Sequence, residues 1–190
     1  MAKERLACAR RTSRPCTSPY ILFREDSAIA RNSDEPLSQA MINDVYNKRI
    51  IELAGNIPRL GRLADAQASA TAHSKLCGST VTVDLKMKGD EVTDFAHEVK
   101  ACALGQASSS IMARNVIGAK ADELRNLRDT VRRMLKENGA PPDGKWADIA
   151  VLEPVRDYKA RHASTLLTFD AVVDAVNQIE AKRRETVAAT

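Results

Sequence analysis

The sequence is poor in aromatic residues and has no concentrated charge of one sign. Only 4% of its 190 residues are Phe, Trp or Tyr, and its formal net charge of +4 is spread along the chain. Proteins that bind nucleic acid use aromatic stacking platforms for single strands and basic patches or stripes for the backbone. Because neither feature is present, we expect no nucleic-acid partner.

Long apolar runs are also missing. No segment approaches the roughly 20 apolar residues that cross a bilayer, and the charged N-terminal residues are not followed by the apolar stretch of a secretory signal. We therefore expect a cytoplasmic protein with no membrane partner. With 44% hydrophobic residues, a chain of this length can bury one ordinary core.

The cysteines are few and widely spaced. They are Cys8, Cys16, Cys77 and Cys102, and no two have the C-x-x-C spacing of zinc ribbons or redox motifs. In a reducing compartment they remain thiols, and thiols that are not packed in a core are kept for reactivity or metal binding. A site that uses them must be assembled by folding.

The N-terminal part of the chain has neither helical nor strand periodicity. We interpret residues 1–40 as a disordered extension, and we expect Cys8 and Cys16 within it to take no part in a site.

The first 24 residues are rich in Arg and contain Glu4 as their only acid, as in a mitochondrial transit peptide. Pro15 and Pro19 would break the amphipathic helix that such a peptide needs. The alternative that we favour is that translation starts at Met41.

One short helix and then a series of strands are predicted in the first half of the remaining sequence. A helix is expected from Asn43 to about Gly55, and small residues at alternate positions indicate a strand over residues 66–72. Apolar and polar residues alternate over residues 80–88, and a Gly-Asp pair leads into a second alternating run that ends near Val99. This pattern predicts a β-hairpin with one buried face.

Helical signals follow the hairpin. Helices are expected over residues 104–118, 121–137 and 165–184, with a helical turn over residues 146–152. Strands followed by helices predict the α+β class, with a small three-stranded antiparallel sheet packed against several helices. The domain would span residues 41–184, and a short tail would follow it.

Two cysteines fall on connections at the same end of this predicted sheet. Cys77 lies between the first strand and the hairpin, where Gly78 lets the backbone turn and exposes the sulfur. Cys102 lies where the hairpin gives way to a helix, and a helix N-terminus favours the nucleophilic thiolate. The alternative for each residue is that it is a small hydrophobe of the core.

The motifs around these cysteines resemble a known family. The segment 101–112, Ala-Cys-Ala-Leu-Gly-Gln-Ala-Ser-Ser-Ser-Ile-Met, resembles the Gly-Cys-Ala-Ile-x-x-Ala-Ser-x-Ser block of NifU/IscU/SufU-type scaffold domains. Leu76-Cys77-Gly78-Ser79 resembles their Asn-Pro-x-Cys-Gly-Asp block. The resemblance runs from Met41 to Arg184 and includes Asp44-Val45-Tyr46 and Arg161-His162-Ala163-Ser164.

The resemblance implies a site of three cysteines and an aspartate. On such a site, sulfur from a cysteine desulfurase and ferrous iron form an iron-sulfur cluster, expected here as a transient 2Fe-2S cluster, for transfer to acceptor apoproteins. The SufU branch holds zinc there instead. In this sequence Cys77 and Cys102 take the first two cysteine positions, whereas Ser79 replaces the aspartate and Ser164 falls at the third cysteine.

Both replacements weaken metal binding, because soft thiolates are what zinc and iron-sulfur centres prefer and a Ser hydroxyl is rarely deprotonated. Two chains in a homodimer can complete four thiolates around one cluster, His162 can enter as a nitrogen ligand, or a partner or small thiol can fill the gap. His162 can equally be a hydrogen-bonded structural residue, and Ser164 can cap the last helix. His73 and His97 have no assigned role.

These residues are compatible with three functions. The first is a non-enzymatic scaffold or sulfur-accepting protein that uses the thiolates of Cys77 and Cys102. The second is a binding module that has kept the fold, lost cluster chemistry and regulates the assembly machinery. The third, a SufU-like zinc-dependent sulfur acceptor, ranks last because the residues present are a poor zinc site.

Overall fold

A computed structural model describes residues 47–188 of the chain. It contains α2 (Lys48–Gly55), β1 (Ala68–His73), β2 (Thr80–Lys88), β3 (Glu91–Lys100), α3 (Ala103–Asn115), α4 (Ala121–Lys136), a 3₁₀ helix η1 (Gly144–Asp157) and α5 (Lys159–Ala188). The predicted α+β class and antiparallel sheet are confirmed. The extension expected over residues 1–40, and the part of the first helix expected before residue 47, lie outside the described residues.

The three strands form one antiparallel sheet in the order β1-β2-β3. Leu85 in the central strand pairs with Ala68 on one side and Phe95 on the other, and directly paired residues share a face of the sheet. Val81, Val83 and Leu85 are fully buried on that face, as the alternation in the sequence predicts.

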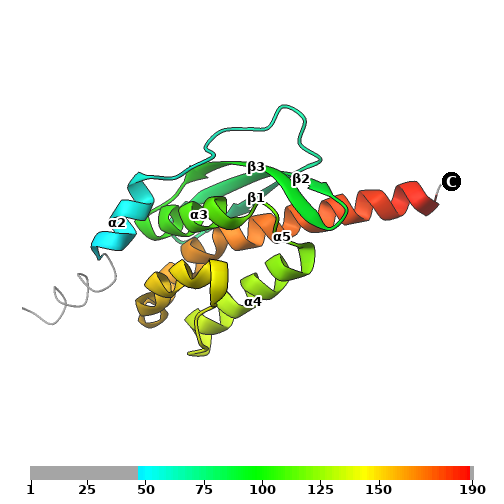
Figure 1. The fold of residues 1–190 in the computed structure, drawn as a ribbon. Helices are drawn as coiled ribbons and strands as arrows, with labels where there is room; N and C mark the ends of the chain where they lie inside the picture. The colour runs from blue at the N-terminus through cyan, green and yellow to red at the C-terminus, as the bar shows by residue number, and fades with distance from the viewer. Residues whose placement is uncertain (1–46, 189–190) are drawn as a thin grey trace, which may run out of the picture. The chain divides into compact units, whose positions relative to one another are not determined.

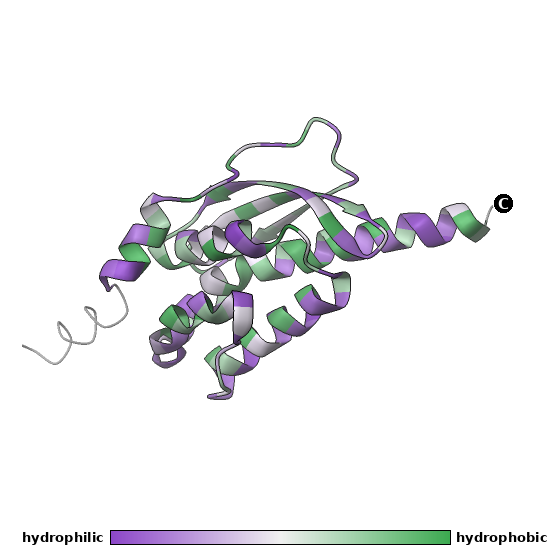
Figure 2. Cartoon of the chain, in the orientation of Figure 1, coloured by the Kyte–Doolittle hydropathy of each residue, from purple (hydrophilic) through white to green (hydrophobic). Residues whose placement is uncertain are grey.

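Helices α3 and α5 cover the apolar face. α5 packs against β1 and β2, α3 packs against β3 and α5, and α4 packs on α5 from the other side, so α5 lies between the sheet and α4 (Figure 1). Figure 2 shows hydrophobic residues along α5 beneath the sheet and mostly hydrophilic ones where it extends beyond the sheet. No helix among residues 47–188 is long and apolar enough to cross a membrane.

The connection between α2 and β1 covers part of the opposite face. Its Arg62 reaches Asp84 of β2, with Nε 2.6 Å from one carboxylate oxygen and Nη2 2.9 Å from the other. The backbone N–H of Leu63 donates to the same carboxylate at 3.0 Å. Asp84 is only 1% exposed, and these donors compensate the burial of its charge.

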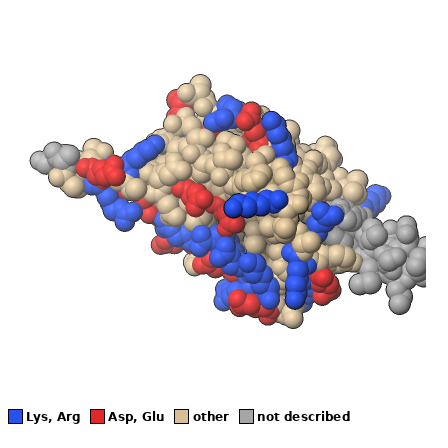
Figure 3. Space-filling model, turned by 180° about the vertical axis from the view of Figure 1, so that it is seen from behind, with Lys and Arg blue, Asp and Glu red and all other residues tan. Residues whose placement is uncertain are grey.

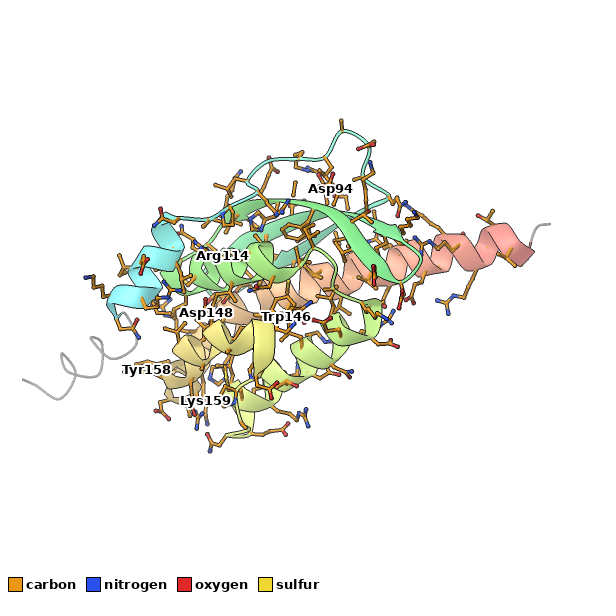
Figure 4. The ribbon with its side chains drawn as sticks, in the orientation of Figure 1. Asp94, Arg114, Trp146, Asp148, Tyr158 and Lys159 are labelled. Atoms are coloured by element: carbon orange, nitrogen blue, oxygen red, sulfur yellow. The ribbon has the colours of Figure 1, made fainter. Side chains whose placement is uncertain are left out.

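A long 3₁₀ helix replaces the helical turn expected over residues 146–152. Trp146, near its start, donates from Nε1 to the carboxylate of Glu123 on α4 at 2.6 Å. Tyr158 and Lys159 lie where η1 passes into α5, at the lower left of Figure 4. This connection places the start of α5 beside the end of the sheet that carries the cysteines.

Helix α5 is longer at both ends than the range 165–184 expected from its apolar spacing. It starts at Lys159, so Ser164 lies inside the helix and is not its N-cap; the Ser164 hydroxyl donates instead to the carbonyl oxygen of Arg161 at 2.9 Å. At the other end the helix continues to Ala188, where a tail was expected from residue 185. Lys182 and Arg183 attach it to the sheet by donating to carbonyl oxygens of Gln67 and Met87 at 2.8 Å.

Candidate functional site

Cys77 lies in a tight turn between β1 and β2. The N–H of Gly78 donates to the carbonyl of Ser74 at 2.9 Å, and the N–H of Ser74 donates to the carbonyl of Ser79 at 2.8 Å. Gly78 has φ of +69°, a conformation that glycine adopts without strain. The turn leaves the Cys77 side chain exposed to solvent.

Two serine hydroxyls surround the Cys77 sulfur. Sγ lies 3.3 Å from the Oγ of Ser74 and 3.0 Å from the Oγ of Ser79. The Cys77 thiol donates to the Oγ of Ser74. When that proton is lost, the Ser74 and Ser79 hydroxyls can donate to the sulfur, and these hydrogen bonds, joined by the Ser79 N–H and the positive charge of Arg161, lower the pKa of the Cys77 thiol to about 7. A substantial fraction of Cys77 is therefore a nucleophilic thiolate at neutral pH.

Cys102 is the N-cap residue of α3, and its side chain makes no capping hydrogen bond to the helix. Its S–H donates instead to the Oγ of Ser164 on α5 at 3.5 Å. The Ser164 hydroxyl proton goes to the Arg161 carbonyl, so an oxygen lone pair is free to accept the thiol proton. Ser164 has no exposed surface.

A glycine lets α3 and α5 approach closely at this point. A Cβ placed on Gly105 would lie 3.0 Å from the carbonyl oxygen of Ser164 and 2.8 Å from the Cβ of Ala101. One turn further along, Ser109 and Thr168 are buried with no hydrogen bond to their side-chain oxygens among the described residues. Small side chains at the contact of the two helices thus hold Ser164 next to Cys102.

The two cysteines lie at the same end of the sheet. His73 pairs with Thr80, and Thr80 pairs with Lys100, so the end of β1, the start of β2 and the end of β3 are side by side. Cys77 and Cys102 flank that row of residues. The first turns of α5 border both, through the charge of Arg161 near Cys77 and the hydroxyl of Ser164 beside Cys102.

The structure does not bring His162 to this site. Its Nε2 lies 3.1 Å from the carbonyl oxygen of Val155 and 3.0 Å from that of Arg156, so this nitrogen carries a proton and donates. Residues two apart on a helix do not share a face, and His162 lines a cavity that Ser164 does not line. We therefore leave it out of the proposed site.

Sequence reasoning singled out Cys77, Cys102, Ser79 and Ser164 but missed Ser74, Gly105 and Arg161 as parts of the site. A glycine in the first turn of a helix was the available signal for Gly105. Nothing in the spacing of Ser74 or Arg161 indicates a contact with Cys77, because both contacts depend on how the turn and α5 fold.

The donor set fits a complete zinc site poorly. Residues 47–188 contain no group of three or more His, Cys, Asp or Glu side chains placed to hold one metal ion. The site offers two thiols and neighbouring hydroxyls. Protein zinc sites, by contrast, use three or four thiolate, imidazole or carboxylate ligands. The same two thiols can contribute half of the four thiolates that usually hold an iron-sulfur cluster.

Comparison with known proteins agrees with this fold and these motifs. The family model of the NifU-like N terminal domain matches residues 45–165. The crystal structure of a nitrogen-fixing NifU-like protein (N-terminal) from Brucella abortus is 72% identical, covers 75% of this chain and 99% of its own, and superimposes with a TM-score of 0.74. The chain belongs to the NifU-like N-terminal domain family.

Two curated relatives show the breadth of the family. The iron-sulfur cluster assembly scaffold protein IscU of Thermotoga maritima is 25% identical over 135 residues, which are 71% of this chain and 94% of that protein. The zinc-dependent sulfurtransferase SufU of Bacillus subtilis is 23% identical over 141 residues, 74% of this chain and 95% of SufU. The chain is thus similar to proteins of both kinds, a cluster assembly scaffold and a zinc-dependent sulfurtransferase.

Proposed function

We propose that this protein is an iron-sulfur cluster assembly scaffold that accepts sulfur on Cys77 and uses Cys77 and Cys102 as its thiolate ligands. The observation that carries the proposal is the pair of cysteines at one end of the sheet, with a serine hydroxyl 3.0 Å from Cys77 and another 3.5 Å from Cys102. Membership of the NifU-like family supports it. The protein acts as an acceptor and assembly surface and not as an enzyme.

Sulfur would arrive as the persulfide of a cysteine desulfurase. The Cys77 thiolate attacks the terminal sulfur of that persulfide, a new S–S bond forms on Cys77, and the desulfurase cysteine leaves as a thiolate. No oxidant is needed for this exchange. Its rate depends on the thiolate fraction of the attacking cysteine, and the pKa of about 7 at Cys77 supports attack at neutral pH.

Iron and sulfide are the cargo of the site. Reduction of the bound sulfur to sulfide takes two electrons from an external reductant, such as a dithiol or an electron-transfer protein. Cys77 and Cys102 supply two thiolates per chain, so a second copy of the chain would complete four around one 2Fe-2S cluster. A small thiol or the acceptor apoprotein can fill the same two positions.

Mass spectrometry of the sulfur-loaded protein tests the proposal. After incubation with a cysteine desulfurase and cysteine, peptide mapping should find persulfide sulfur on Cys77, and Cys77→Ser should abolish most of the transfer. Ser69→Cys, at an exposed position of β1, is a control thiol that should remain unmodified. Equal loading of Cys77 and this control would contradict the proposal.

The binding module without cluster chemistry is favoured by one observation, the serines at the two replaced ligand positions. Such a module would need neither thiol, so its affinity for a desulfurase would be unchanged in Cys102→Ser and Cys77→Ser. A scaffold would lose sulfur or iron loading in the same variants. The two functions are therefore separated by measuring loading and affinity on the same proteins.

A further inference from the structure

A cavity lies beside the first turns of α5 and the end of β1. It has a volume of about 590 Å³ and is formed by β1, α4 and α5. Volumes of this size are typical of sites for small molecules. None of the four proposed thiol-site positions, Cys77, Cys102, Ser79 and Ser164, lines it.

The charged side chains that line this cavity are mostly cationic. Arg132 and Lys136 come from α4, and Lys159 comes from the first residue of α5. Neither Lys136 nor Lys159 has a carboxylate within ion-pair distance among residues 47–188. On the face shown in Figure 3, Lys and Arg side chains are interspersed with Asp and Glu.

Asp170 is the one acid among the residues that line the cavity, and it compensates only part of the positive charge there. Asp170 lies 3.7 Å from the guanidinium of Arg132, and burial raises the pKa of its carboxyl in spite of that neighbour. Three cations, Arg132, Lys136 and Lys159, thus line the cavity against one carboxylate, which leaves an excess of positive charge to attract an anion.

The floor of the cavity is apolar, and two histidines complete its wall. Leu166 and Leu167 of α5 are each 4% exposed and line it. His162 lines it from the first turns of α5, and His73 from the end of β1. An apolar floor lowers the local dielectric and strengthens the attraction between the cations and an anionic group.

We propose that this cavity binds a small organic anion, with its carboxylate or phosphate group at Lys136, Lys159 and Arg132 and its apolar body on Leu166 and Leu167. The proposal is independent of the cluster chemistry at the cysteines. Because His73 directly precedes Ser74, the site borders the turn that carries Cys77.

The chain's three histidines provide the readout. His73 and His162 line the cavity, whereas His97 is fully buried in the sheet with its Nε2 3.0 Å from the carbonyl oxygen of Pro58. Benzoate and phenyl phosphate are the two probes, benzamide is the neutral isostere of benzoate, and imidazole NMR signals are followed at constant pH. Benzoate, phenyl phosphate or both should shift the His73 and His162 signals saturably and leave His97 unchanged.

Charge reversal distinguishes a site from weak surface attraction. Lys136→Glu with Lys159→Glu should weaken probe binding by about tenfold or more, and Lys48→Glu, at an exposed position of α2, should not. An unchanged His97 signal shows that each variant is folded. The proposal is overturned if neither anion shifts His73 or His162, if benzamide binds as well as benzoate, or if Lys48→Glu weakens binding as much.

Discussion

The Sγ of Cys102 and the Oγ of Ser164 lie 3.5 Å apart, although 62 positions separate the two residues in the chain. The resemblance to the scaffold motifs predicts that Ser164 stands at the position of a third cysteine. A cysteine at this buried position would put a second thiol directly beside Cys102. The backbone therefore holds position 164 close enough to Cys102 for two thiols to lie side by side.

Ser164→Cys should therefore strengthen metal binding. We expect the affinity for zinc to rise by about tenfold or more, because a third thiolate replaces a hydroxyl that is rarely deprotonated. Competition with a chromogenic chelator under reducing conditions measures the change. Ser69→Cys adds a thiol far from the site and should leave the affinity as it is; an equal rise in both variants would contradict the placement.

The reactivity of Cys77 should follow a thiolate that forms near neutral pH. The rate of alkylation by iodoacetamide, measured on the Cys77 peptide by mass spectrometry, should rise with pH and reach half its plateau near pH 7. Ser79→Ala and Ser74→Ala each remove a donor to the thiolate, so the midpoint should move up toward the ordinary cysteine value of about 8.5. A midpoint that is already near this value in the natural protein would show that the serines do not stabilise the anion.

The close approach of α3 and α5 predicts a strong effect at Gly105. Gly105→Ala should lower the free energy of unfolding by about 1–3 kcal/mol, because the added methyl meets Ala101 and the Ser164 carbonyl at 3.0 Å or less. Urea unfolding measures the loss. Gly55→Ala is the matched control, since a Cβ there meets nothing within 4 Å, and a similar loss in both variants would argue against a specific helix contact.

The buried carboxylate of Asp84 should stabilise the fold in a pH-dependent way. Burial by itself would raise its pKa, but hydrogen bonds from Arg62 and Ser69 and the Leu63 N–H outweigh burial and lower it. The stabilisation is therefore complete above the unfolded value of about 3.9 and is lost as the pH falls through the folded value.

Asp84→Asn tests this account. It should cost about 2 kcal/mol of unfolding free energy at neutral pH, and the difference from the natural protein should shrink below about pH 4. The control is Asp65→Asn, because the Asp65 carboxylate is 72% exposed in its pair with Lys86, and exposed ion pairs contribute little. A difference between Asp84→Asn and the natural protein that is independent of pH would show that packing and not charge is responsible.

Periodicity was sufficient to predict the three strands and the positions of α3 and α4, and local motifs were sufficient to single out the two cysteines. The hairpin was predictable because each strand alternates between a buried and an exposed face. The start of α5 was not predictable, because residues 159–164 lack the apolar spacing on which the prediction depended. A cap of the last helix therefore stayed open as the alternative role of Ser164.

The contacts of the site depend on three-dimensional packing that the sequence does not display. Arg161 reaches the surroundings of Cys77 only because α5 begins beside the turn between β1 and β2. Conversely, His162 is near Ser164 in sequence, but the helix turns it toward another cavity. Closeness to Ser164 in the sequence was therefore misleading for His162. For Arg161, distance from Cys77 in the sequence gave no hint of their contact in the fold.

The central claim is that Cys77 and Cys102 together hold the cluster that this protein assembles. Anaerobic reconstitution of the full chain with ferrous iron, cysteine, a cysteine desulfurase and a dithiol reductant, followed by iron and sulfide analysis and size-exclusion chromatography, tests it most directly. We predict a visible cluster absorption, about half a 2Fe-2S cluster per chain in a dimeric fraction, and loss of both iron and sulfide in Cys77→Ser and in Cys102→Ser. A folded protein that binds no iron or sulfide, or a cluster that persists in both variants, would contradict the claim.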